Sequence, residues 1–263
     1  MLNVENVYKT FNMGTVNEKT ALSGISLRLK EGEFVTVIGG NGAGKSSLLS
    51  AVAGVYGIDS GKIEIGGTDV TKFPEHKRAA YIGRVFQDPM TGTAANMGIE
   101  ENLALAKRRG NRRGLRWGVS HAEREEYRAR LAEFELGLED RLTSKVGLLS
   151  GGQRQALTLI MATLKRPKLL LLDEHTAALD PKTAAKVLEL SDRIVKNDNL
   201  TTMMVTHNMR DAIAHGERLI MLYEGKIIID IAGDEKKRLK TKDLLEMFEN
   251  LSGSEEADGG LLL

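Results

Sequence analysis

The sequence predicts an α/β protein whose parallel core sheet is interrupted by a helical segment. Two runs, Phe34–Ile38 and Leu169–Leu172, are almost wholly apolar, as is typical of parallel strands covered on both faces. Between about Met90 and Arg166, strand-like patterns give way to apolar residues at helical spacing. Strand and helix patterns alternate again after that segment, so both ends of the chain are expected to build one core.

The first third of the chain is predicted to form short strands joined by glycine turns. Val4–Phe11 and Leu22–Leu29 alternate between apolar and polar residues, which predicts half-buried strands. Lys62–Ile65, Tyr81–Phe86 and, much later, Thr201–Thr206 are further strand candidates. The N-terminal region is therefore expected to be rich in β-structure.

Helix starts in the second half are marked by capping residues. Ser120–Glu123 and Ser150–Gln153 both have serine followed three residues later by glutamate or glutamine, which is the pattern of a capping box. Asp180–Pro181 supplies an N-cap and a first-turn proline. Pro167 is expected to end the helix of the second capping box, and Arg218–Asp230 resembles a β-hairpin.

The composition excludes several classes of protein. The chain has 263 residues, a formal net charge of +1 and no cysteine. So small a net charge does not indicate nucleic-acid binding, and the lack of cysteine excludes disulfides and thiolate metal sites. No apolar run approaches the roughly 18 residues needed to span a bilayer, and residues 1–6 do not resemble a signal peptide. A role at a membrane would therefore require other chains that span it.

The segment Gly39–Ser46 matches the pattern GxxxxGK[ST] and lies between a predicted buried strand and a predicted helix. Its glycines let backbone N–H groups wrap around phosphates without a steric clash. In this pattern, Lys45 reaches the β- and γ-phosphates of a nucleotide, and the Ser46 hydroxyl is a ligand of Mg²⁺. The alternative is a glycine-rich turn that matches by chance, which the flanking strand and helix disfavour.

Two carboxylates, Asp173 and Glu174, follow the leucine-rich strand directly. Ligands collect at the carboxyl ends of parallel strands, so Asp173 is expected to bind Mg²⁺ through water. Glu174 is then the residue that polarises the water attacking the phosphate. An acid pair that caps a helix on a solvated loop is the alternative interpretation.

A second anion-binding feature lies at Leu149–Gln155, which has the sequence LSGGQRQ. Ser150 is predicted to cap a helix here, and Gly151 and Gly152 leave backbone N–H groups of its first turn bare. A helix N-terminus attracts anions because its N–H groups are unpaired and the macrodipole is positive there. The chain therefore carries two phosphate-binding elements that lie far apart in sequence.

These motifs, in this order, resemble the ATP-binding-cassette (ABC) family over residues 1–250. The resemblance implies a P-loop NTPase (RecA-like) parallel-sheet core, an N-terminal antiparallel β subdomain and an inserted α-helical subdomain. It assigns residues 1–88 and 167–250 to the core and the β subdomain, and residues 89–166 to the helical subdomain. Residues 251–263 are polar and rich in glycine, and are expected to form a disordered tail.

The resemblance also implies an ATP site shared by two cassettes. One chain would hold ATP with the glycine-rich loop and with an aromatic ring stacked on adenine, for which Phe11 and Tyr8 are the competing candidates. The other chain would close over the nucleotide with LSGGQ and Asp180. The implied residues are Phe11, Gly39, Gly40, Asn41, Gly42, Ala43, Gly44, Lys45, Ser46 and Ser47 from one chain, and Ser150, Gly151, Gly152, Gln153 and Asp180 from the other.

Two more residues take their roles from the resemblance. His207, which follows a predicted strand, is implied to be the switch histidine that contacts the γ-phosphate. Gln87 is implied to sense the γ-phosphate and Mg²⁺ at the hinge of the helical subdomain. The implied catalytic residues are therefore Glu174, His207 and Gln87, and the implied Mg²⁺ ligands are Ser46, Gln87 and Asp173.

The chain departs from the family pattern at His175, where proline usually follows the catalytic glutamate. Proline would stiffen the loop that leads from Glu174 to Asp180. His175 is therefore expected to loosen that loop or to add a titrating neighbour to Glu174.

The basic segment Lys107–Trp117 is open to three interpretations. It is a solvated loop, a contact with lipid headgroups or a partner, or a nucleic-acid contact. Its place in the helical insert, which abuts the membrane subunit in ABC importers, favours lipid over nucleic acid.

The implied function is ATP hydrolysis by a dimer that drives a membrane transporter from the cytoplasmic face of the membrane. The sequences of Gly98–Ala106 and Asp173–Asp180 are similar to those of cassettes that import an amino acid or a similar small solute. ATP and Mg²⁺ are the implied cofactors; the implied partners are a second cassette, permease subunits and an extracytoplasmic solute-binding protein, and no nucleic acid. A soluble ABC ATPase, such as one of iron–sulfur cluster assembly, is the alternative, while Glu174 and His207 disfavour a module without catalysis.

Overall fold

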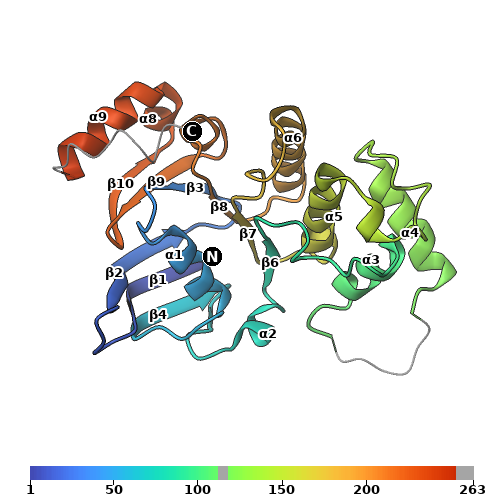
Figure 1. Cartoon of the computed structure of the whole chain (residues 1–263), viewed down its shortest axis with the longest axis horizontal. Coiled ribbons are helices and arrows are strands. Elements are labelled where there is room, and N and C mark those ends of the chain that lie inside the picture. Colours follow the sequence, from blue (N-terminus) through green and yellow to red (C-terminus); the bar gives the residue numbers. More distant parts are fainter. Residues whose placement is uncertain (112–117, 253–263) are drawn as a thin grey trace.

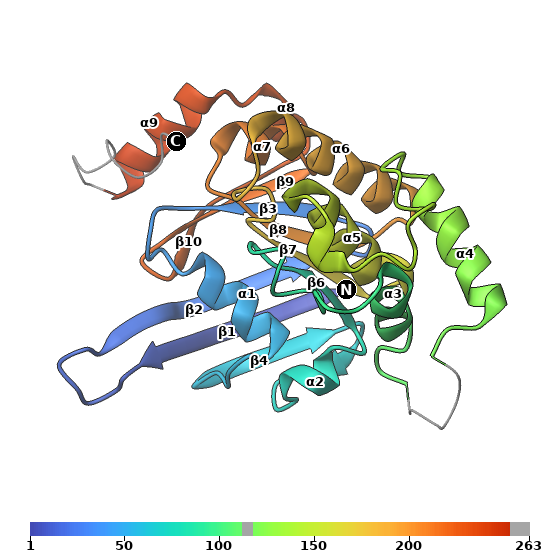
Figure 2. The ribbon, with the colours of Figure 1, turned by 45° about the vertical axis from the view of Figure 1, so that its right-hand side comes forward.

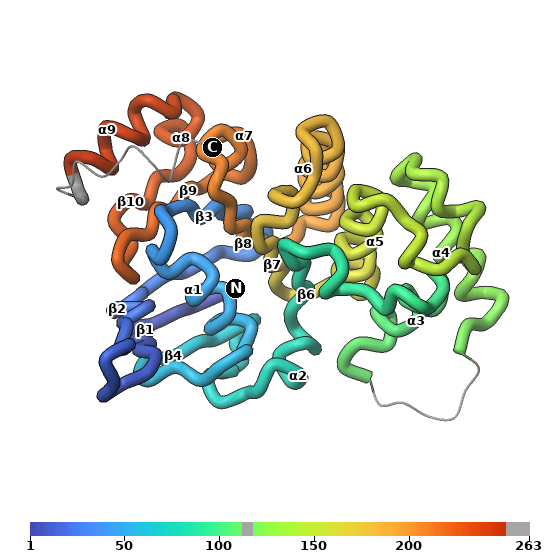
Figure 3. The backbone as a smooth tube through the Cα atoms, viewed as in Figure 1, coloured from blue at the N-terminus to red at the C-terminus, as the bar shows by residue number. Residues whose placement is uncertain are grey.

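The computed structural model describes residues 1–111 and 118–252 of the chain. A four-stranded N-terminal sheet lies beside a six-stranded core sheet, and a helical insert stands at the far end of the core sheet (Figures 1 and 3). This arrangement confirms the predicted fold class.

The N-terminal sheet has the strand order β2-β1-β4-β5, and all of its pairings are antiparallel. Its strands are β1 (Leu2–Phe11), β2 (Lys19–Leu29), β4 (Ser60–Ile65) and β5 (Thr68–Asp69). The buried residues of β1 include Leu2, Val4 and Val7, which share one apolar core with the six-stranded sheet. Helix α2 (Glu75–Arg78) follows this sheet along the chain.

The core sheet has the strand order β10-β9-β3-β8-β7-β6. Its strands are β3 (Phe34–Ile38), β6 (Ile82–Val85), β7 (Leu169–Asp173), β8 (Thr202–Val205), β9 (Arg218–Tyr223) and β10 (Lys226–Ala232). Strands β9, β3, β8, β7 and β6 run parallel, and β10 pairs antiparallel with β9 in the predicted hairpin. The loops after β3, β7 and β8 therefore leave the sheet at one edge, and these loops carry most of the predicted catalytic residues.

Helices cover both faces of the core sheet. Helix α1 (Lys45–Ala53) lies between the two sheets and fills the core that they share (Figure 2). On the opposite face, α5 (Gly151–Leu164) and α6 (Pro181–Asn197) pack against Leu170 and Leu172 of β7. Helices α7 (Met209–Ala214), α8 (Asp234–Arg238) and α9 (Thr241–Ser252) cover the β9–β10 side.

The insert between β6 and β7 is helical, as predicted. It contains α3 (Ile99–Lys107), α4 (His121–Ala132), the 3₁₀ turn η1 (Val146–Leu148) and α5. Tyr127 and Leu131 of α4 are buried against α3 and α5, which fits the helical spacing seen in the sequence. The first half of this insert also includes residues 112–117, which lie outside the described residues.

The predicted helix caps are present. The side chains of Ser120, Ser150 and Asp180 accept hydrogen bonds from the backbone N–H three residues ahead. Two predicted ends differ from the structure: α5 ends at Leu164, ahead of Pro167, and α9 continues to Ser252, beyond the predicted start of the tail at residue 251. The remaining predicted tail, residues 253–263, lies outside the described residues.

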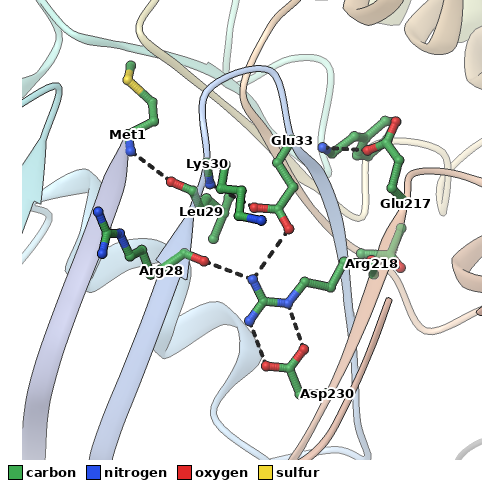
Figure 4. A network of polar contacts seen from close by, with 10 residues as sticks. Met1, Arg28, Leu29, Lys30, Glu33, Glu217, Arg218 and Asp230 are labelled. Carbon is green, nitrogen blue, oxygen red and sulfur yellow. Dashed lines mark hydrogen bonds and ion pairs between the residues drawn. The ribbon is translucent and has the colours of Figure 1, made fainter. Parts of the chain in front are cut away.

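Arg218, at the start of β9, joins the two sheets (Figure 4). Its guanidinium donates two hydrogen bonds of 2.6 Å to Asp230 on β10 and one of 2.8 Å to the carbonyl oxygen of Arg28 on β2. Glu33, which directly precedes β3, accepts a further bond of 3.4 Å. Bidentate arginine–carboxylate pairs fix geometry as well as adding energy. The N-terminal sheet is therefore held against the strand that leads into the glycine-rich loop.

Candidate nucleotide-binding site

The glycine-rich loop connects β3 to α1. The Lys45 ammonium folds back into it and donates hydrogen bonds to the carbonyl oxygens of Gly39 (2.7 Å) and Gly40 (3.1 Å). Burial lowers the pKa of the Lys45 amine, and the nearby charge of Glu174 opposes that shift. The two carbonyl oxygens thus hold the lysine side chain at the centre of the loop. Helix α1 has Gly44 as its N-cap and no side-chain cap, so N–H groups of its first turn are available to an anion.

Glycine is required at several loop positions because of close packing. A Cβ atom on Gly39 would collide with the carbonyl oxygen of Leu222, and one on Gly44 would lie 2.6 Å from the carbonyl oxygen of Ala21. Both residues also have positive φ angles, of 152° and 105°. By contrast, no heavy atom lies within 4 Å of a Cβ built on Gly40. The loop is therefore packed against β2 and β9 on one side and open at Gly40.

The structure brings Glu174 and His207 together at the edge of the core sheet. They follow β7 and β8, which are paired in parallel, and His207 Nδ1 lies 3.5 Å from Glu174 Oε2. Glu174 has a φ of 43°, in the left-handed region. Its backbone N–H donates to the carbonyl oxygen of Val205 at 2.9 Å. The sheet thus places a carboxylate, an imidazole and the Lys45 amine in one neighbourhood, and groups of this kind can exchange a proton with a bound water.

Asp173 has a partner that the sequence did not predict. Arg84 on β6 lies 3.0 Å from one carboxylate oxygen, and both side chains are about 15% exposed. The Arg84 guanidinium also lies 4.6 Å from the centre of the Phe86 ring. The sequence did contain a sign of this ion pair, because Arg84 is a charged residue in the otherwise apolar strand Tyr81–Phe86. Its partner could not be identified from the sequence, because the contact with Asp173 depends on the register of β6 against β7.

The residues present fit Mg²⁺ only as part of a nucleotide complex. In the described ranges, 1–111 and 118–252, no group of three or more His, Asp or Glu side chains could hold a metal ion. Mg²⁺ is typically bound by one or two protein oxygens together with phosphates and water. Ser46 and Asp173 offer such oxygens at the glycine-rich loop and at the end of β7, so the donor set fits a nucleotide-bound metal.

Gln87 is exposed and follows β6 by two residues. The preceding residue, Phe86, accepts a 3.0 Å hydrogen bond at its carbonyl oxygen from Gln155 Nε2. Gln155 is fully buried on α5, the helix that begins with the LSGGQ residues. The Gln87 segment and that helix are therefore linked directly, a connection that sequence reasoning missed.

The residues predicted to act in trans lie together in the structure. Ser150 Oγ accepts from the Gln153 N–H, and the Gln153 side chain accepts from the Ser150 N–H, both at 3.3 Å. A Cβ on Gly151 would lie 3.4 Å from Leu179, and one on Gly152 would collide with the Thr183 methyl group. Leu179 and Thr183 flank Asp180, which caps α6. The N-termini of α5 and α6 thus form one surface.

The aromatic candidates for adenine stacking differ in their surroundings. The Phe11 ring meets the Tyr56 ring edge-on, with centroids 5.1 Å apart, and Lys9 Nζ lies 5.5 Å from its centre. The Tyr8 side chain lies against Gly24 on β2. Phe11 is therefore part of an aromatic and cationic group beside α1, which is the better-formed stacking surface of the two.

His175 does not add a neighbour that titrates near neutral pH, so that expectation was wrong. It is 2% exposed, and its Nε2 lies 2.9 Å from Ser191 Oγ on α6. Burial, followed by the charge of His215, lowers the pKa of His175 to about 4. The imidazole is neutral at physiological pH and is fastened to a helix.

The described part of the basic segment is bound to the insert itself. Lys107 pairs with Glu126, and Arg108 lies 3.0 Å from Glu123. Arg109 donates to the carbonyl oxygens of Ala162 (3.1 Å) and Lys165 (2.9 Å) at the end of α5. These contacts favour a structural role for residues 107–109. Trp117 and its basic neighbours 112–116 lie outside the described residues.

Comparison with known proteins identifies the family. Residues 22–177 match the ABC transporter family model. The chain belongs to the ABC transporter family. It is 44% identical over 249 residues to a tyrosine transport ATP-binding protein of Clostridioides difficile, covering 95% of this chain and 99% of that protein. It is 36% identical over 229 residues to the methionine import ATP-binding protein MetN of Corynebacterium diphtheriae, covering 85% of this cassette and 64% of that protein.

Solved ABC cassettes have the same fold. The dimeric cassette MJ0796 in a post-hydrolysis state with ADP and Pi matches with a TM-score of 0.75 and 30% identity, covering 88% of this cassette and 98% of that chain. The cassette MJ1267 in its ADP conformation matches with a TM-score of 0.75 and 25% identity, covering 94% and 98%. As an ABC cassette of the import type, this protein binds ATP and hydrolyses it to drive transport. No helix in the described part of the chain is long and apolar enough to cross a membrane.

Proposed function

We propose that this cassette is the ATPase subunit of an amino-acid importer and that it works as an ATP-dependent dimer. It would act at the cytoplasmic face of a membrane with permease subunits and an extracytoplasmic solute-binding protein. The observation that carries the proposal is the division of the site residues. The Lys45, Glu174 and His207 side chains gather at the core-sheet edge, while Ser150–Gly152 and Asp180 gather at the N-termini of α5 and α6.

In this proposal the core-sheet edge holds the nucleotide. Lys45 and the N–H groups of Gly39–Ser47 bind the phosphates, and the Phe11 ring stacks on adenine. Mg²⁺, when bound through Ser46, Gln87 and Asp173, would neutralise charge on the phosphates. Glu174 accepts a proton from the attacking water, and the His207 imidazole, 3.5 Å away, orients that water toward the γ-phosphate.

The second chain completes the site from the opposite side. Its α5 N-terminus, capped by Ser150 and Gln153, presents N–H groups and a positive dipole end to the γ-phosphate. Asp180 lies beside that helix end and contacts the partner cassette. The two chains therefore share the charge of the phosphate, and its release after hydrolysis removes the contact that holds them together.

A glutamate substitution tests the catalytic assignment. Glu174→Gln should bind ATP and dimerise, but its turnover should fall by about 100-fold or more, because proton acceptance by the side chain is lost. Glu135→Gln is the control, since Glu135 is also a glutamate with positive φ, at 54°, but is exposed and lies in the insert. ATPase rate and ATP-dependent dimer formation are the measurements. Turnover near the parental rate in Glu174→Gln would rule out the base assignment.

The transport assignment is tested separately. The similarity to a tyrosine transport protein over nearly its whole length favours an amino acid, with tyrosine the first to try. Tagged cassette should co-purify from solubilised membranes with a polytopic permease identified by mass spectrometry, and the reconstituted complex should accumulate labelled tyrosine when ATP is supplied. Recovery with soluble partners alone would contradict the importer proposal. Uptake of another amino acid but not tyrosine would refute the substrate.

A further inference from the structure

The backbone of Glu174 is in a conformation that must be maintained by its surroundings. Its φ of 43° lies in the left-handed region, where a residue with a Cβ is strained by about 1 kcal/mol or more. Two backbone hydrogen bonds of 2.9 Å act here, from the Glu174 N–H to Val205 and from the Ala177 N–H to Glu174. They fix the peptide groups on either side, and the Leu179 N–H donates a further bond of 3.1 Å to the carbonyl oxygen of Thr176. The bonds of Ala177 and Leu179 lie within the loop itself, so the attachment of the loop to the neighbouring helix depends on side chains.

His175 supplies such a side-chain contact. Its imidazole is buried and its Nε2 lies 2.9 Å from Ser191 Oγ. Ser191 Oγ also lies 2.8 Å from the carbonyl oxygen of Val187. A carbonyl only accepts hydrogen bonds, so the single hydroxyl proton of Ser191 is used there. The bond between His175 and Ser191 is therefore made by the Nε2–H of a neutral imidazole, which defines its tautomer.

The same turn of α6 also holds the segment that follows His207. Asp192, next to Ser191, accepts a 2.7 Å hydrogen bond from His215 Nδ1 at the end of α7. That helix begins at Met209, two residues after His207. Lys236 on α8 donates a 3.0 Å hydrogen bond to the Gly216 carbonyl oxygen. Adjacent residues of α6 thus bond His175, in the loop that carries Glu174, and His215, at the far end of the helix that follows His207.

We propose that His175 is a positioning residue, which holds the Glu174 carboxylate in register with His207 by hydrogen-bonding to Ser191 on α6. The inference rests on the role proposed above for Glu174. It explains how this chain replaces the rigidity that proline gives in other cassettes. A side chain packed on a helix substitutes for a ring in the backbone.

Three variants test the proposal. His175→Ala should reduce kcat for ATP hydrolysis by about 10-fold, because a small displacement of a catalytic group is costly, while the dissociation constant for ATP stays within about 2-fold. Ser191→Ala should reduce kcat in the same direction. His175→Gln should recover most of the lost rate, because its side-chain N–H can reach the position of the imidazole Nε2–H. Thr163→Val is the matched control: it also removes a buried hydroxyl bonded to the carbonyl oxygen four residues back, but on α5, and kcat should be unchanged.

The outcomes separate this inference from the proposed function. If Glu174→Gln is inactive and His175→Ala has the parental kcat, His175 does not position the base, although the base assignment stands. If Thr163→Val and His175→Ala lose rate equally, the effect is general destabilisation and the inference is wrong. A failure of glutamine to restore rate would also overturn it. Activity in Glu174→Gln would overturn the proposed function first.

Discussion

The two halves of the proposed ATP site are built in different ways. At the edge of the core sheet, charged side chains already have protein partners. Asp173 pairs with Arg84 at 3.0 Å, and Glu174 lies 3.5 Å from His207. Lys45 is bonded to two carbonyl oxygens of its own loop. This half is organised by electrostatic contacts within one chain, so its charged side chains are positioned before a nucleotide binds.

The other half, at the N-terminus of α5, is organised by a cap and by close packing. The Ser150 hydroxyl satisfies one backbone N–H, and Gly152 makes room for the Thr183 methyl group. A helix terminus attracts a phosphate only when one is brought to it. The difference between the halves therefore predicts that variants in the first impair nucleotide binding or chemistry, whereas variants in the second impair closure of the dimer.

The largest expected effect that separates the halves comes from Ser150→Arg. A bulky cation at the α5 N-terminus should reduce turnover by about 100-fold or more, comparable with removing a transition-state donor. The dissociation constant for ATP should change by less than about 3-fold, because the monomer's own loop is untouched. Steady-state ATPase rates and titration with a fluorescent ATP analogue measure the two quantities. An equal loss of affinity would argue against a site completed by a second chain.

A smaller effect is expected from the packing of Gly152. Gly152→Ala would place a methyl group against the Thr183 methyl, and overpacking of this kind costs about 1–3 kcal/mol. The free energy of unfolding, measured with urea, should fall by that amount. Adding Thr183→Ser removes the obstructing methyl and should restore much of the stability, while the Thr183 backbone bond to Asp180 remains possible. If the double variant is as unstable as Gly152→Ala alone, the contact with Thr183 is not what requires glycine.

Local patterns in the sequence were sufficient to predict the local parts of this site. Gly39–Ser46 and the caps at Ser150 and Asp180 each depend on residues within a few positions, so their geometry follows from the sequence alone. The carboxylates after β7 could be placed because parallel strands share one carboxyl edge.

The contacts that hold these elements in place could not be predicted in the same way. Arg84 meets Asp173 only because β6 pairs with β7 in one register. His175 meets Ser191 because α6 packs back over the sheet, 16 residues further along the chain. Gly152 is a further example. The sequence accounted for a glycine at this position by the access that an anion needs, and the structure adds a second reason, because a Cβ atom there would collide with the Thr183 methyl group. Such pairings depend on tertiary packing, which carries no short-range signal.

The last expected effect, similar in size to that of Gly152→Ala, concerns acid stability and again separates the halves. The pKa of His175 is about 4 in the folded chain and near 6.5 when unfolded. Between these values the unfolded chain binds a proton that the folded chain does not, so stability is lost as the pH falls below about 6.5. This group alone should lower the free energy of unfolding by about 2 kcal/mol between pH 7 and pH 5.

Urea unfolding of three proteins at these two pH values measures this effect. His175→Gln does not titrate there, so its stability should fall by about 2 kcal/mol less than that of the parent chain. Ser150→Ala removes the α5 cap and should cost about 1 kcal/mol equally at both pH values, because neither serine nor its backbone partner titrates. If His175→Gln has the same pH dependence as the parent chain, the imidazole takes up a proton in the folded state. His175 would then make no contribution to the fall in the free energy of unfolding between pH 7 and pH 5.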